Sequence, residues 1–115
     1  MKMPFIHTRT NREISKETEK ALARELGNAV ALLSKSENWL MLQFEDQCRL
    51  YFKGDCNLPL AFVNIKLYGK ASADAYEKMT AEVTRILQDH LSIPPQGVYV
   101  DYEETDRWGW NGSNF

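Results

Sequence analysis

Apolar positions follow two different periods in the first half of the chain. Apolar residues gather at the start of the segment from Phe5 to Thr10, which is typical of a strand. After Ser15, apolar residues recur every three or four positions, which predicts an amphipathic helix capped by Ser15 and ended by Ser34-Lys35-Ser36. A second strand is predicted from Trp39 to Phe44. The buried face of the helix is expected to contain Leu22, Leu26, Ala29, Val30 and Leu33.

The second half of the chain has the same order of elements. A strand is predicted from Ala61 to Leu67, followed by the turn Tyr68-Gly69-Lys70 and a helix capped by Ser72. Pro94-Pro95 should stop that helix, and a fourth strand is predicted from Gln96 to Tyr102. The apolar face of the helix is expected to contain Tyr76, Met79, Val83, Ile86, Leu87 and Leu91.

The two halves superpose at a spacing of about 57 residues, as in Phe5 and Phe62, which indicates pseudo-repeats over about 4–57 and 58–115 of one domain, 1–115. Each half is a β-α-β unit, which favours parallel pairing with a right-handed crossover. The expected fold class is α+β, a two-layer sandwich of a four-stranded mixed sheet with both helices on one face. Phe62 and the run Val98-Tyr99-Val100 put apolar or aromatic groups on both faces of the sheet, so we expect an apolar uncovered face and assembly around it.

Composition narrows the class of protein further. The chain has 115 residues, 43% apolar and 26% charged, which are the proportions of a globular domain. Its net charge of −2 is dispersed, so no nucleic-acid partner is expected. No run of apolar residues is long enough for a membrane helix, and no signal-peptide core follows Met1, which predicts a cytoplasmic protein or, alternatively, secretion without a leader. Cys48 and Cys56 form no CxxC pair and have no histidine at zinc-ligand spacing, so we expect free thiols, no metal and no cofactor.

Four motifs carry a resemblance over nearly the whole chain. They are Met3-Pro4-Phe5-Ile6, Leu67-Tyr68-Gly69-Lys70, the stretch 91–100 (LSIPPQGVYV) and the terminus 108–115 (WGWNGSNF). Together they resemble the macrophage migration inhibitory factor (MIF) family of the tautomerase superfamily. The resemblance implies a homotrimer in which three sheets form an inner barrel with the helices outside. It also implies a small α-keto acid as substrate and raises a protein receptor as a further partner.

Pro4 matches the catalytic proline of that family, whose nitrogen is the general base of keto–enol tautomerisation. An α-amino group has a pKa of about 7.7–8.0, and burial beside a cation lowers that pKa, so the neutral amine suits catalysis near pH 7. Here Met1-Lys2-Met3 precedes Pro4, which makes its nitrogen an amide without a usable lone pair. Either translation starts at Met3, which is then removed, or the extension is native and the chemistry is absent. Without catalysis, Pro4 simply begins an edge strand.

Other residues match substrate-binding positions of the family. Lys35 would hold the substrate carboxylate and lower the pKa of the proline, whereas otherwise it is a lysine at a helix end. The backbone amide of Tyr68 would bind substrate, and Tyr99 and Asp101, which share one side of the last strand, would reach a neighbouring subunit's pocket. Asp101 stands where an asparagine is often found, which disfavours anionic substrates. Aromatic residues at the pocket mouth, or alternatively in packing contacts, are Trp110, Phe115, Phe5 and Trp39.

Two classes of function follow from the resemblance. The first is an intramolecular oxidoreductase of the phenylpyruvate tautomerase type, acting on α-keto acids if Pro4 is the mature N-terminus. The alternative is a catalytically silent trimer that acts as a cytokine-like or interaction protein. Hydration or dehalogenation of an unsaturated acid by the same proline would need arginines in the pocket, and no motif places Arg9, Arg49 or Arg107 there.

Overall fold

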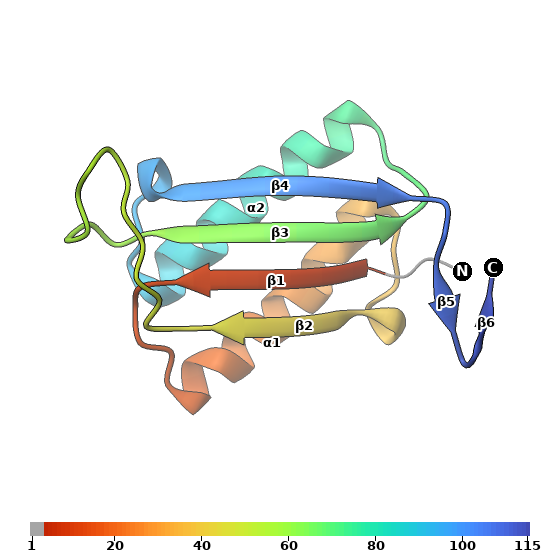
Figure 1. Cartoon of the computed structure of the whole chain (residues 1–115), viewed down its shortest axis with the longest axis horizontal. Coiled ribbons are helices and arrows are strands. Elements are labelled where there is room, and N and C mark those ends of the chain that lie inside the picture. The colour runs from red at the N-terminus through yellow and green to blue at the C-terminus, as the bar shows by residue number, and fades with distance from the viewer. Residues whose placement is uncertain (1–3) are drawn as a thin grey trace.

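A computed structural model describes residues 4–115 of the chain, and Met1, Lys2 and Met3 lie outside the described residues. The chain forms two layers, a four-stranded sheet in the order β2-β1-β3-β4 and two helices that both cover one face (Figure 1). The α+β two-layer fold expected from the sequence is therefore confirmed.

The order strand, helix, strand occurs twice along the chain. Strand β1 (Pro4–Thr10), helix α1 (Lys16–Ala29) and β2 (Met41–Glu45) form the first unit, and β3 (Ala61–Tyr68), α2 (Ala73–Leu91) and β4 (Val98–Thr105) form the second. The strands within each unit are parallel, whereas β1 and β3 join the units in antiparallel pairing. A small hairpin of β5 (Gly109–Trp110) and β6 (Ser113–Asn114) follows at the end of the sheet.

Serine residues delimit both helices. The side chain of Ser15 accepts a hydrogen bond from the backbone N–H of Thr18, and that of Ser72 accepts one from Ala75. Helix α1 continues into a 3₁₀ turn, η1 (Val30–Leu33), that ends at Ser34 in the left-handed conformation, with φ of 58°. Ser92 ends α2 in the same way, with φ of 54°. Both predicted caps are confirmed.

Two predicted strand boundaries are wrong because short 3₁₀ turns replace strand residues. Strand β2 begins at Met41 rather than Trp39, since Ser36 caps the turn η2 (Glu37–Trp39) by accepting from the N–H of Asn38. Strand β4 runs over Val98–Thr105 rather than 96–102, because the residues before it form the turn η3 (Pro95–Gly97).

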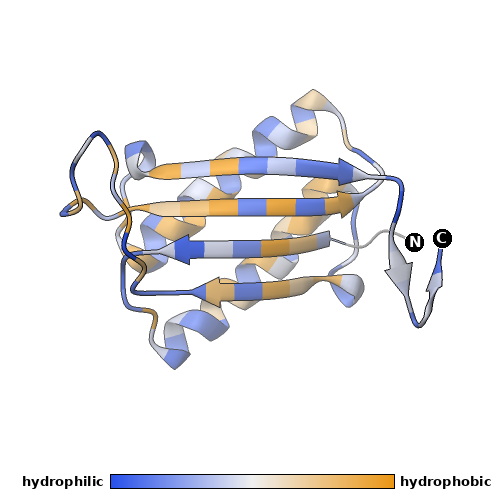
Figure 2. Ribbon diagram, viewed as in Figure 1, coloured by the Kyte–Doolittle hydropathy of each residue, from blue (hydrophilic) through white to orange (hydrophobic). Residues whose placement is uncertain are grey.

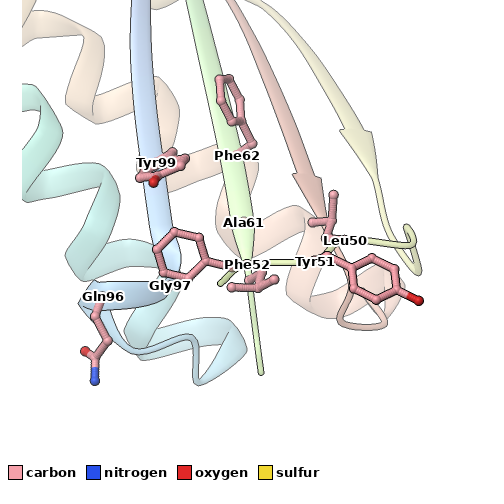
Figure 3. Close-up of a pocket in the computed structure, with 9 residues that line it drawn as sticks. Leu50, Tyr51, Phe52, Ala61, Phe62, Gln96, Gly97 and Tyr99 are labelled. Atoms are coloured by element: carbon pink, nitrogen blue, oxygen red, sulfur yellow. The ribbon is translucent and has the colours of Figure 1, made fainter. Parts of the chain in front are cut away.

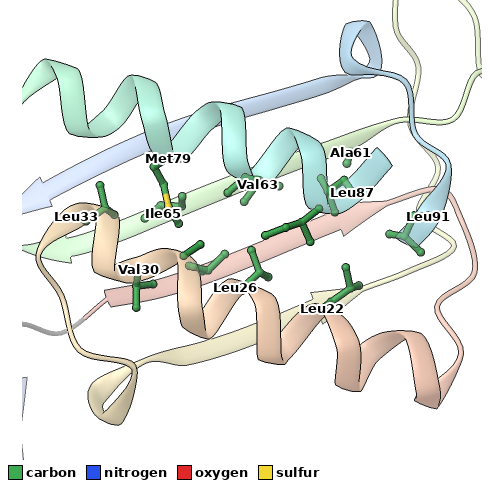
Figure 4. Close-up of a cluster of buried hydrophobic side chains, with 14 of the residues drawn as sticks. Leu22, Leu26, Val30, Leu33, Ala61, Val63, Ile65, Met79, Leu87 and Leu91 are labelled. Atoms are coloured by element: carbon green, nitrogen blue, oxygen red, sulfur yellow. The ribbon is translucent and has the colours of Figure 1, made fainter. Parts of the chain in front are cut away.

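The core lies between the helices and the sheet (Figure 4). The helix faces predicted from the apolar period supply most of it, and the strands add the residues that point toward the helices. Tyr76 is the exception, since it is only partly buried at the edge. Fully buried members include Ile6, Leu22, Val30, Val63, Ile65, Leu67, Met79, Val83, Ile86 and Leu87.

The uncovered face of the sheet carries both apolar and polar side chains. Val98 and Val100 pack against the core, so Tyr99 alone of that run lies on the uncovered face, where it is 58% exposed. Alternation along the strands places polar and charged residues there as well, and apolar and hydrophilic segments alternate along β3 (Figure 2). Apolar or aromatic groups thus lie on both faces of the sheet, as expected, but on the uncovered face they are interspersed with polar ones. The polar residues on this face include His7, Arg9, Gln43, Glu45, Asn64, Lys66, Asp101 and Glu103, and the apolar or aromatic ones include Phe5, Met41, Phe62 and Tyr99.

Within residues 4–115, neither helix combines the length and the apolar character that crossing a bilayer requires.

Candidate active site

Pro4 opens β1 at the end of the sheet where β3 finishes. It is buried and pairs in register with Leu67, the last buried residue of β3. Proline suits this position because its missing N–H removes no hydrogen bond from the first residue of a strand. The register therefore places Pro4 beside the turn that Tyr68 and Gly69 begin.

Lys35 reaches the same place from the end of the first helical segment. Left-handed Ser34 turns the chain there, and Lys35 is only 6% exposed. Its Nζ donates a hydrogen bond to the backbone carbonyl of Tyr68, at 3.1 Å. A Cβ at Gly69 would lie at an ordinary contact distance from the same Nζ, 3.9 Å, so it is the φ of +85° rather than lack of space that favours glycine in this turn.

Aromatic side chains from the C-terminal hairpin complete this end of the molecule. The rings of Tyr68 and Phe115 are 5.6 Å apart, and Trp39 meets Trp110 edge to face at 4.9 Å. A hollow between the hairpin strands is lined in part by Trp110 and Phe115, which are 47% and 43% exposed. We use the name proline end for the group formed by Pro4, Lys35, Tyr68, Trp39, Trp110 and Phe115.

Phe5 is next to Pro4 but on the uncovered face of the sheet. It pairs with Met41 on one side and Lys66 on the other, and its ring lies 6.2 Å from that of His7. The structure therefore places Phe5 at the rim of the proline end, on the uncovered face of the sheet.

Tyr99 and Asp101 are not brought to Pro4 within one chain. Tyr99 pairs with Phe62, five residues before Leu67 along β3, or roughly 17 Å at the rise of a strand. Asp101 pairs with Asn64, whose side-chain amide donates to Asp101 at 2.6 Å and to Glu103 at 2.8 Å. Asn64 thus holds two carboxylates close together on the uncovered face.

An aromatic cavity of about 90 Å³ lies beside Tyr99 (Figure 3). It is at the start of β3, whereas Pro4 pairs with Leu67 near the end of that strand. Phe52 stacks edge to face on Tyr99 at 5.4 Å, and Leu50, Tyr51 and Phe62 are also in its wall. Sequence reasoning missed this cavity. Its only signal was the apolar run Leu50-Tyr51-Phe52 just before the Lys53-Gly54 turn.

Two partly buried tyrosines connect the turn after Tyr68, helix α2 and strand β4 by hydrogen bonds. The hydroxyl of Tyr76 accepts from the N–H of Ala71 at 3.1 Å and donates to Glu104. Burial, followed by the bond to Glu104, raises the pKa of Tyr76. Burial likewise raises the pKa of Tyr102, whose hydroxyl donates to the carbonyl of Tyr76 at 3.0 Å. Both phenols therefore stay protonated at neutral pH and act as donors.

Among residues 4–115, no cluster of three or more His, Cys, Asp and Glu residues could hold a metal ion. The two histidines instead bond carboxylates, His7 that of Glu45 and His90 that of Glu25.

The fold and the proline end define a protein of the tautomerase superfamily. The sequence model of the macrophage migration inhibitory factor family matches residues 3–115, so the chain belongs to this family. A comparison with curated proteins found no match.

Solved structures agree over nearly the whole chain. The MIF2 protein of Leishmania major is 28% identical, with a TM-score of 0.92, 98% of this chain and 97% of that chain being covered. The MIF-like protein of Entamoeba histolytica is 21% identical, with a TM-score of 0.87, and the match covers 98% of this chain and 99% of that chain. A third, 13% identical with a TM-score of 0.84 and coverage of 95% and 93%, was solved after inactivation by 2-oxo-3-pentynoate. The last two likenesses show the fold alone.

Proposed function

We propose that this chain, when Pro4 is its first residue, catalyses keto–enol tautomerisation of α-keto acids such as phenylpyruvate. The observation that supports this most strongly is the convergence of Pro4 and Lys35 at one end of the sheet. Pro4 is held by its register with Leu67, and the Lys35 ammonium is held 3.1 Å from the carbonyl of Tyr68, the next residue.

The proposed chemistry is proton transfer by the Pro4 nitrogen. As a neutral secondary amine, it removes a proton from the carbon beside the keto group, and the keto oxygen gains a proton to form the enol. The reverse steps return the keto acid. The burial of Pro4 and a lysine nearby both disfavour the charged amine, so its pKa falls toward the working pH.

Lys35 would bind the substrate carboxylate. Its ammonium is almost fully buried, and an ion pair formed away from water is stronger than one formed at the surface. The backbone amide of Tyr68 would donate a second hydrogen bond. Phe115 and Trp110 would then form an apolar wall for an aryl group.

A homotrimer would complete the pocket. MIF proteins typically form homotrimers, and Tyr99 and Asp101 would enter the proline end of a neighbouring subunit. Their distance from Pro4 along the same chain fits a contribution in trans. Sedimentation at several protein concentrations tests this, and a monomer at all of them would remove the shared pocket.

The test of the reaction compares two forms of the N-terminus. Protein that starts at Met3, with Met3 removed and Pro4 verified by intact mass, should interconvert phenylpyruvate tautomers, as followed by the absorbance of the enol. Protein that retains residues 1–3 should be inactive, because its Pro4 nitrogen is an amide. Equal activity of both forms would contradict the proposed base.

Two substitutions in the processed protein sharpen the test. Pro4→Gly and Lys35→Ala should each lower kcat/KM by at least about 100-fold, the size expected for a general base. Lys78→Ala is a matched control, since Lys78 is an exposed lysine that pairs with Asp74 on helix α2. A processed trimer that binds keto acids without turnover would instead favour the silent interaction protein.

A further inference from the structure

Two cysteines that the proposed reaction does not use lie on one hollow at the other end of the sheet. Cys48 and Cys56 both line a cavity of about 470 Å³, together with Arg12 and Arg49. Cys48 is half-buried and Cys56 is exposed, and both are thiols. They belong to the segment 46–60, which connects β2 to β3.

Both arms of this segment are anchored on consecutive residues at the exit of β1. The N–H of Cys48 donates to the carbonyl of Thr10 at 2.9 Å. The side chain of Asn11 donates to the carbonyl of Leu58 at 2.7 Å and accepts from the N–H of Leu60 at 2.9 Å. The arm with Cys48 and the arm with Cys56 are thus held at the same corner of the sheet.

A tight turn reverses the chain between the two cysteines. Phe52 and Asp55 exchange backbone hydrogen bonds of 2.9 and 3.0 Å, and Lys53 and Gly54 between them both have positive φ. Among the described residues, backbone pairing within 46–60 is confined to this bridge. Beyond this bridge, no ladder of backbone hydrogen bonds within 46–60 opposes a change in the spacing of the two arms.

We propose that this hollow is an oxidation site, at which peroxide converts Cys48 and Cys56 into an intramolecular disulfide. The exposed Cys56 thiol attacks a peroxide oxygen, which gives a sulfenic acid and one water molecule. The thiol of Cys48, whose Sγ lies 3.5 Å from the carbonyl of Glu45, then attacks the Cys56 sulfur and releases a second water. Two thiols and one peroxide thereby yield one disulfide and two waters.

The disulfide would act on the aromatic cavity beside Tyr99. Leu50, Tyr51 and Phe52 lie between the cysteines and form one wall of that cavity. A disulfide between the cysteines would close a covalent ring around these three residues and restrict the conformations that this wall can adopt. The thiol state would then control the surface near Tyr99, which is distinct from Pro4 and Lys35.

The experiment treats reduced, full-length protein with one equivalent of hydrogen peroxide and blocks the remaining thiols with a maleimide. Trypsin cleaves after Lys35, Arg49, Lys53 and Lys66, so Cys48 falls in peptide 36–49 and Cys56 in peptide 54–66. The expected main product is these two peptides joined, and a reductant should separate them. The outcome is independent of catalysis by Pro4, so it is distinguishable from failure of the proposed reaction.

Single variants test the order of the steps. Cys48→Ser should leave a sulfenic acid on Cys56 that dimedone traps, whereas Cys56→Ser, a change at an exposed position, should abolish most trapping and all joined peptide. Recovery of both cysteines as maleimide adducts would overturn the site. Disulfides between two molecules, or sulfinic acid as the main product of the unmodified chain, would overturn it equally.

Discussion

The two faces of the sheet differ most clearly along β3. Toward the helices, Val63, Ile65 and Leu67 are fully buried, in contact with both helices or their neighbours. On the other face, Asn64 makes two hydrogen bonds to carboxylates and Lys66 is exposed. One strand thus presents an apolar surface to the core and, at Asn64 and Lys66, a polar surface to its surroundings.

The uncovered face is organised rather than merely polar. Gln43, His7, Asn64 and Asp101 lie in one row across β2, β1, β3 and β4, as the strand registers show. His7 bonds Glu45, and Asn64 bonds Asp101 and Glu103. A subunit that packed on this face would meet fixed polar groups, so assembly here would depend on the pairing of polar groups as well as on the burial of apolar surface.

The largest difference in unfolding free energy between the two faces is expected when Ile65→Ala is compared with Lys66→Ala. Ile65 is fully buried, and truncation of such a residue costs about 2–5 kcal/mol of unfolding free energy. Lys66→Ala, its exposed neighbour, should change that free energy by less than about 0.5 kcal/mol. Denaturant unfolding at one fixed protein concentration measures both. Similar losses for the two variants would mean that the uncovered face is buried as deeply as the core.

Asn64→Leu should cause the next largest loss of unfolding free energy. It leaves the carboxylates of Asp101 and Glu103 side by side without their shared donor, and loss of a hydrogen bond to a charged group costs about 1.5–3 kcal/mol. Salt should recover part of the loss, since it screens the repulsion between the two carboxylates. The control is Gln43→Leu, an exposed amide in the same row on the edge strand. If both variants lost the same unfolding free energy at every salt concentration, Asn64 would not be what stabilises the two neighbouring carboxylates.

The layers and helices could be predicted from sequence because each rests on local patterns. Ser15 and Ser72 cap their helices as predicted, and the apolar period identifies the buried faces. The side on which Val98 and Val100 lie depends on the register of β4 against β3, which no local pattern reveals. This register decides that Val98 and Val100 face the core, whereas Tyr99 between them lies on the uncovered face.

The candidate site was predictable only through the resemblance. The hydrogen bond from Lys35 to Tyr68 joins residues 33 positions apart, and it depends on the left-handed turn at Ser34. The turn at Asn111-Gly112, where both φ values are positive, did carry a local signal, because Asn-Gly is typical of hairpins. The hairpin it closes brings Phe115 to Tyr68, which pattern alone does not indicate.

Two threonines on the helix-facing side of β1 should respond to the same substitution with smaller changes in unfolding free energy, of opposite sign. Among the described residues, the Oγ1 of Thr8 is the buried side-chain oxygen or nitrogen that lacks a hydrogen-bond partner. Thr8→Val replaces this hydroxyl with a methyl group of similar size and should raise the unfolding free energy by about 1 kcal/mol. Thr10→Val should lower it, because the Thr10 hydroxyl donates to the carbonyl of Leu60 at 2.7 Å. The same change at two buried threonines should thus have opposite signs in thermal unfolding.

The smallest change in stability is expected on the outer side of the helix layer, where acid protonates Glu25. Glu25 on α1 accepts from Arg85 on α2 at 2.8 Å and also bonds His90, and these hydrogen bonds, that of Arg85 first, lower the pKa of Glu25 to about 2. The unfolded chain takes up this proton near pH 4.5, the ordinary value, so the contribution of Glu25 is complete above that pH and is lost as the pH falls toward 2. Glu25→Gln should therefore flatten the decline of the thermal midpoint between pH about 4.5 and about 2. Glu77→Gln, an exposed acid elsewhere on α2, should leave the decline unchanged. If both variants respond to acid as the parent chain does, the hydrogen bonds of Glu25 between the two helices add nothing to stability.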